Sequence, residues 1–150
     1  MSLKARLETD LKAALLGGDR FSTEVLRGLK AVILNEEVSQ GKRDSGLDDA
    51  TIETLISREV KKRRDSVQQY TDAQRPELAE AEANEAAVLE GYLPEQLSEA
   101  DINAAIIEAI AATGASGPAA MGQVIGAVKA KLGNSADGAT VARLTKEALL

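Results

Sequence analysis

Two stretches of the chain carry cations in patterns that could hold phosphate groups. The first is MGQVIGAVKAKLGNSADGA, residues 121–139, in which four glycines lie close to two lysines. The second is REVKKRRD, residues 58–65, the densest basic run in the chain. Lysine and arginine bind phosphate oxygens, and glycine lets a ligand approach the backbone closely. These residue types are therefore candidates for phosphate binding.

The residues that are absent limit what other chemistry the chain could do. The 150 residues include no cysteine and no histidine. A zinc site built from these ligands, a cysteine nucleophile and a histidine base are therefore excluded. An enzyme would have to work with carboxylates, lysines, hydroxyls and backbone amides. We expect no metal and no cofactor.

The glycines of residues 121–139 do not form a nucleotide-binding loop. Gly122 and Gly126 lack the spacing of the P-loop and dinucleotide motifs, and no strand is expected before them. On a helix they lie one turn apart on one face, and each costs about 1 kcal/mol relative to alanine. Either a neighbouring helix or a nucleic-acid backbone could use that bare face, and the pattern leaves both readings open.

The basic run at 58–65 also has two interpretations. It could be a solvated helix face, in which Glu59 and Arg63 form a favourable pair four residues apart. It could instead be a second phosphate-contacting patch. The members of this secondary basic patch are Arg58, Lys61, Lys62, Arg63 and Arg64.

The elements that must position these residues all read as helices. Apolar residues recur at helical spacing along the chain, and aromatic residues make up only 2%, so the core must be aliphatic. We predict an all-α fold with a bundle of about four helices in residues 1–93 and a compact three-helix tail domain in residues 94–150. Gly91 and Pro94 mark the break. The helices are expected at about 2–16, 19–39, 48–73, 76–91, 98–113, 118–132 and 137–148.

Helix caps and charge refine this picture. Asp48 or Asp49, the SEAD capping box at residues 98–101, and Asp137 are expected to cap helices. The helix at 76–91 is strongly acidic, which favours a solvated face over a site for a hard cation. The net charge of −6 disfavours general nucleic-acid binding, and we expect no DNA partner. Residues 115–150 are nevertheless locally basic.

No apolar run approaches the roughly 20 residues that a membrane span needs, and we expect no membrane association. The N-terminal sequence MSLKARLETD has charges throughout and no apolar core of a secretory signal. On these grounds we expect a cytoplasmic protein.

Several segments together resemble the GatB/YqeY family. They are LRGLKAVILNEEV, EVKKRRDSVQQY, RPELAEAEANEAAVLEGYLPEQLSEADI and GASGPAAMGQVIGAVKAKLGNSADGATVARLTKEAL, which cover nearly the whole chain in order. The resemblance implies a small all-helical protein whose C-terminal part is similar to the tail domain of the B subunit of the tRNA-dependent Asp/Glu amidotransferase. That carbon–nitrogen ligase uses glutamine as amido donor, and its tail helps to hold tRNA. The activating and ammonia-producing parts are not in this chain, so any such activity would need other subunits.

The resemblance also implies which residues contact RNA. Family members often carry lysine where this chain has Gln123, and basic residues where it has Asn134, Ser135 and Ala139. We therefore expect weak, salt-sensitive binding. The implied RNA-binding residues are Gly122, Gly126, Lys129, Lys131, Arg143 and Lys146.

Three hypotheses of function follow. The first is a non-catalytic accessory protein that binds tRNA or another RNA and assists amidotransfer or another tRNA step. The second is a protein–protein adaptor without an RNA role, with an amidotransferase or another tRNA-related protein as partner. The third is an independent carbon–nitrogen ligase or amidase, for which the sequence offers no catalytic residues.

Overall fold

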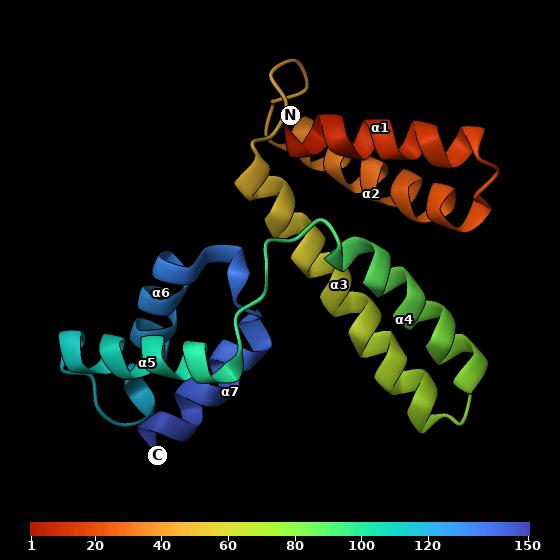
Figure 1. Ribbon diagram of the computed structural model, residues 1–150. Coiled ribbons are helices and arrows are strands. Elements are labelled where there is room, and N and C mark those ends of the chain that lie inside the picture. The colour runs from red at the N-terminus through yellow and green to blue at the C-terminus, as the bar shows by residue number, and fades with distance from the viewer. The chain divides into compact units, whose positions relative to one another are not determined.

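The computed structural model describes residues 1–150 and contains seven α-helices and no strand, which confirms the all-α prediction (Figure 1). The chain divides into two compact units, residues 1–93 and residues 94–150. Short 3-10 turns at Pro118–Ala120 and Gly133–Ser135 flank the sixth helix. The helices are α1 (Leu3–Leu16), α2 (Arg20–Ser39), α3 (Asp49–Asp72), α4 (Pro76–Glu90), α5 (Glu99–Thr113), α6 (Met121–Leu132) and α7 (Gly138–Leu149).

Side-chain caps fix the start of most helices. The Asp48 carboxylate accepts the backbone N–H of Thr51, and Asp137 caps α7 in the same way through Thr140. Ser98 caps α5 by accepting the N–H of Asp101. Each cap satisfies one of the N–H groups that a helix end leaves without a partner.

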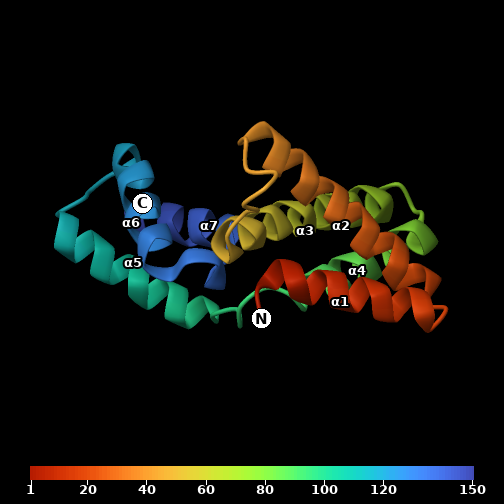
Figure 2. The same cartoon turned by 90° about the horizontal axis from the view of Figure 1, so that it is seen from above.

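Residues 1–93 are built from two helical hairpins. Figures 1 and 2 both show α3 and α4 lying side by side. The helices α1 and α2 are joined by the turn of residues 17–19, and Figure 2 shows them splaying apart toward the start of α1. The aliphatic core joins both hairpins through residues such as Leu29, Ile52, Ile56 and Leu89, all of which are almost fully buried. The Tyr92 hydroxyl donates to Asp10 at 2.6 Å and anchors the end of this unit to α1.

Residues 94–150 form a three-helix unit around a second aliphatic core. The backbone N–H of Leu97 donates to the carbonyl of Ser135 and ties the entry segment to the turn before α7. Gly114 ends α5 with φ +66°, a conformation that glycine adopts without strain. The most deeply buried members of the core are Ile102, Ile106, Val124, Val128, Val141 and Leu144.

No single helix has the length and apolar character required to cross a membrane. The bent pair formed by Glu99–Thr113 and Pro118–Ser135 meets the criterion together, by length and composition alone. The core of residues 94–150 accounts for that apolar character, because it draws on the buried faces of both helices.

Candidate nucleic-acid interface

The two glycines of α6 lie on an open face of the helix. Both Gly122 and Gly126 are exposed, and a Cβ atom added at either position would meet nothing within 4 Å. No neighbouring helix therefore uses the space that these glycines clear. Helix packing, one of the two interpretations of the glycine pair, receives no support from the structure.

The two lysines of α6, Lys129 and Lys131, are close in sequence but lie on different faces of the helix. Lys129 follows Gly122 and Gly126 at i+7 and i+3, so the three share one face of the helix. Lys131 follows Gly122 at i+9, about 180° round the helix. Its ammonium group binds Glu108 of α5 at 2.6 Å. Only Lys129 thus borders the bare face.

The same lysine also lies beside the start of α7. Its Nζ is 3.9 Å from the position that a Cβ of Gly138 would occupy, and Gly138 is the first residue of α7. Asp137 accepts the backbone N–H and the hydroxyl of Thr140 at 3.0 and 2.8 Å. The first backbone N–H groups of a helix have no partner within the helix and attract anions. Gly138 is not among the residues expected from the sequence to contact RNA, although the predicted Asp137 cap marks where α7 begins.

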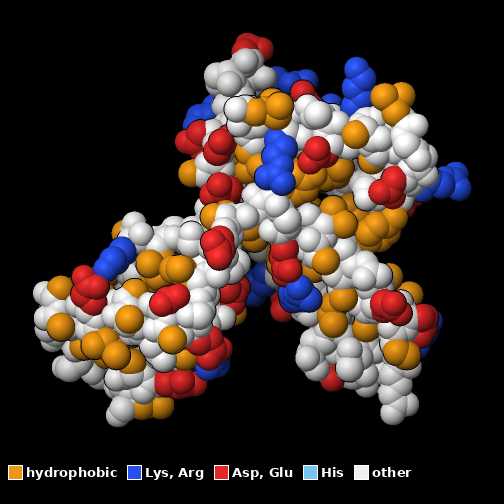
Figure 3. Space-filling model, in the orientation of Figure 1, with side chains coloured by type: hydrophobic (Ala, Val, Ile, Leu, Met, Phe, Trp, Pro, Cys, Tyr) orange, Lys and Arg blue, Asp and Glu red, His pale blue; other side chains and the backbone are white.

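The remaining candidate cations differ in whether a carboxylate already binds them. Arg143 contacts Glu99 of α5 and lies 3.3 Å from Glu147. Lys146 is exposed on α7, and neither it nor Lys129 takes part in an ion pair. Ion pairs between exposed side chains are worth only about 0–1 kcal/mol, so Arg143 can exchange its partner. On the face that Figure 3 shows, red acidic side chains are plain over residues 94–150 and blue ones are sparse.

The secondary basic patch of α3 faces carboxylates. Arg63 is only 21% exposed and binds Glu59 at 3.0 Å and Glu85 of α4 at 3.1 Å. Arg64 binds Glu90 of α4 at 2.6 Å. The acidic helix and the basic run, which the sequence presented as two separate features, are therefore partners across the α3–α4 hairpin.

The other members of this patch are more exposed. Lys62 also binds Glu59, at 3.1 Å, and Lys61 lies 3.7 Å from Asp65. Arg58 is exposed and takes part in no ion pair. The structure contains no group of three or more acidic residues placed to hold a metal ion.

Comparison with known proteins identifies a family over nearly the whole chain. The family model described as "Yqey-like protein" matches residues 4–149. The chain belongs to this family. The match includes α6 and α7, so the open glycine face and the cations beside it lie within the matched residues.

Three relatives share one name, "Altered inheritance of mitochondria protein 41, mitochondrial". The Kluyveromyces lactis protein is 33% identical over 88 residues, which are 59% of this chain and 46% of the relative. The Lachancea thermotolerans protein is 32% identical over 104 residues, 68% of this chain and 54% of the relative. The Pyrenophora tritici-repentis protein is 26% identical over 145 residues, 95% of this chain and 78% of the relative.

These relatives correct one expectation. Their names give a mitochondrial location, which contradicts the cytoplasmic location expected from the charged N-terminal sequence. Charge and hydropathy near the N-terminus test for a secretory signal. They do not identify the compartment that the names of the relatives give. The chain spans about half the length of the first two relatives it matches.

Proposed function

We propose that this Yqey-like protein is a non-catalytic accessory protein that binds tRNA through the exposed face of α6 and the adjoining surface of α7. The observation that carries the proposal is the bare strip at Gly122 and Gly126, which no other helix of residues 94–150 covers. A side-chain-free helix face allows a sugar–phosphate backbone to approach closely, and Lys129 lies where it could meet a phosphate.

The charges favour contact with phosphates over reading of bases. RNA tertiary shape is recognised largely through phosphates and 2′-hydroxyl groups, for which lysine, arginine and free backbone N–H groups are suitable donors. Lys129 and Lys146 are free for this role, and Arg143 could join by leaving its exposed carboxylate partners. The resemblance of the C-terminal part to an amidotransferase tail domain supports tRNA as the RNA and assistance to amidotransfer as the setting.

The number of free cations gives a quantitative expectation for the salt dependence. Each neutralised phosphate contributes about −0.9 to the slope of log K against log salt for duplex nucleic acid. Two cations predict a slope of about −2, and recruitment of Arg143 would steepen it to about −3. Binding should therefore be weak and should fall steeply as salt is raised.

The test is a titration of fluorescently labelled tRNA with the full chain at low and moderate salt. The variant Lys129→Glu/Lys146→Glu should bind at least about tenfold more weakly than wild type. The control Lys12→Glu/Lys42→Glu makes the same change of net charge with exposed lysines elsewhere and should bind as wild type does. Equal losses in both variants, or no binding by wild type, would remove support for the interface. Nuclease-resistant binding of a stoichiometric protein partner, without tRNA binding, would favour the adaptor hypothesis.

A further inference from the structure

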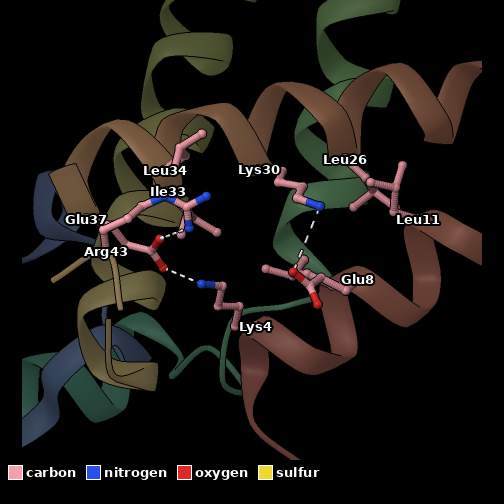
Figure 4. Close-up of a pocket in the computed structure, with 10 residues that line it drawn as sticks. Lys4, Glu8, Leu11, Leu26, Lys30, Ile33, Leu34, Glu37 and Arg43 are labelled. Atoms are coloured by element: carbon pink, nitrogen blue, oxygen red, sulfur yellow. Dashed lines mark hydrogen bonds and ion pairs between the residues drawn. The ribbon is translucent and has the colours of Figure 1, made fainter. Parts of the chain in front are cut away.

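A groove in the other unit of the chain has no role in the proposed RNA binding. It lies between α1 and α2 and contains a cavity of about 170 Å³ (Figure 4). Leu11, Leu26 and Ile33 contribute apolar lining. A dry cavity of about 150 Å³ is large enough to bind benzene, so this one can take a single large apolar side chain.

Apolar surface continues beyond the cavity along both helices. Leu34 lines the cavity and is 37% exposed, and Val38 follows it one turn later with 63% exposure. Leu15 lies one turn after Leu11 on α1 and is 47% exposed. From Lys4 to Leu15 the strip extends about 16 Å along the helix axis. Because of this elongated shape, the groove matches a helix better than a compact small molecule.

The rim of the groove carries positive charge that the chain itself does not fully neutralise. Figure 4 shows Lys4 and Arg43 directed toward Glu37, which is nearly fully buried and lies 2.6 and 3.7 Å from their nitrogen atoms. Lys30 points toward Glu8, but the two are 3.9 Å apart and Lys30 is 60% exposed. Outside the cavity lining, Arg27 precedes Lys30 by three residues on α2, is exposed and has no ion pair.

We propose that this groove binds an amphipathic helix of a partner protein, with one bulky apolar side chain in the cavity and flanking carboxylates on Lys30 and Arg27. A helix laid into an apolar groove is recognised by anchors at helical spacing, and complementary rim charges set its orientation. Exposed surface of α1 and α2 shows hydrophobic and basic side chains next to one another (Figure 3). This proposal concerns residues 1–93 and does not depend on RNA binding by α6 and α7.

The probe is a labelled synthetic helical peptide with leucines at i, i+3, i+4 and i+7 and glutamates on both flanks. A matched peptide has lysines in place of the glutamates. Fluorescence anisotropy with the full chain should show saturable binding of the acidic peptide, about tenfold tighter than binding of the basic one. Absence of saturable binding of the acidic peptide up to about 1 mM, or equal binding of both peptides, would overturn the proposal.

Two variants locate the binding. Lys30→Glu should weaken the acidic peptide about fivefold, and Leu34→Ala should weaken it about threefold. Lys61→Glu makes the same charge change on α3, outside the groove, and should have no effect. If Lys61→Glu weakened binding of the acidic peptide as much as Lys30→Glu does, the attraction would be nonspecific and the proposed site would be overturned.

The same experiments separate other occupants. Saturable binding of decanoate that Lys30→Glu abolishes, without peptide binding, would assign the groove to a small anionic amphiphile instead. A dimer seen by sedimentation and dissociated by Lys30→Glu would assign it to a second copy of the chain. Because Lys129 and Lys30 lie in different units, failure of the peptide test and failure of the tRNA test are independent results.

Discussion

The basic run of α3 and the cations of α6 and α7 have the same side chains, and they differ in what lies opposite them. On α3, Arg63 and Arg64 meet glutamates of α4. On α6 and α7, Lys129 and Lys146 meet no carboxylate, and two bare glycines border the first of them. In the denser run, four of the five cations, all but Arg58, already have a carboxylate partner. Charge density along a sequence therefore does not measure the charge that a partner can reach.

The largest expected effect tests whether the α3 patch is structural. Replacement Arg63→Met leaves Glu59 and Glu85 without their shared partner, and Glu59 is only 9% exposed. Because Glu59 then keeps only the exposed Lys62 as a cationic partner and Glu85 loses the arginine that binds it, we expect the free energy of unfolding to fall by about 2 kcal/mol. Urea unfolding followed by tyrosine fluorescence measures it, because both tyrosines, Tyr70 and Tyr92, lie in residues 1–93.

Lys61→Met is the matched control for this measurement. Its ion pair with Asp65 is exposed at both ends, so its loss should change the free energy of unfolding by less than about 0.5 kcal/mol. If Arg63→Met were as mild as its control, the α3 cations would be as free as those of α6, and the comparison would fail.

The second prediction sharpens the role of the bare face. In Gly126→Leu a large side chain enters the strip, and we expect about tenfold weaker tRNA binding with no loss of stability. Stability should rise slightly, because glycine inside a helix is about 1 kcal/mol less favourable than a good helix former.

Gly28→Leu is the matched control, since Gly28 is also exposed inside a helix with nothing within 4 Å of an added Cβ. It should gain similar stability and bind tRNA as wild type does. If Gly126→Leu bound tRNA as tightly as wild type, the glycine face would be exposed but would not contact tRNA.

The third prediction concerns buried polar groups, which have partners in one unit and lack one in the other. In residues 1–93 the buried carboxylates of Glu37 and Glu59 have cationic partners, whereas the hydroxyl of Thr145 in α7 is fully buried without a hydrogen bond. Removing that hydroxyl in Thr145→Val should raise the free energy of unfolding by about 1 kcal/mol. Circular dichroism during thermal unfolding measures it, and a drop in stability would show that the hydroxyl has a partner in solution.

The smallest effect is a change in pH dependence. The hydrogen bond from Lys4 lowers the pKa of Glu37 below its ordinary value of 4.5, and Arg43 adds to this. A lowered folded-state pKa contributes stability that is complete above the unfolded pKa and is lost as pH falls through the folded value. Glu37→Gln should therefore flatten the decline of stability between neutral pH and about pH 3. An unchanged slope would show that this ion pair does not act in solution.

Much of the fold could be predicted from the sequence because its signals are local. Helical spacing of aliphatic residues and caps such as Asp48, Ser98 and Asp137 depend on neighbours a few positions away. Pairing of Arg63 with Glu85 depends on how α3 and α4 align, and no local pattern specifies that alignment. The groove between α1 and α2 was missed for the same reason.

The candidate site shows the same limit on a smaller scale. Sequence proximity grouped Lys129 with Lys131, although a helix carries them to different faces. Counting the rotation per residue could have separated them beforehand. The nearness of Lys129 to Gly138 could not have been counted, because it depends on how α6 and α7 pack.

The bare face of α6 has a further consequence for motion. Gly126, inside this twelve-residue helix, lowers its local stability by about 1 kcal/mol relative to alanine, and no packing contact at that position offsets this. We expect backbone amides of α6 to exchange with deuterium sooner than those of α5, through openings that leave the rest of the core intact. A ligand bound to the bare face of α6 should therefore slow deuterium exchange of the α6 backbone amides more than that of any other helix.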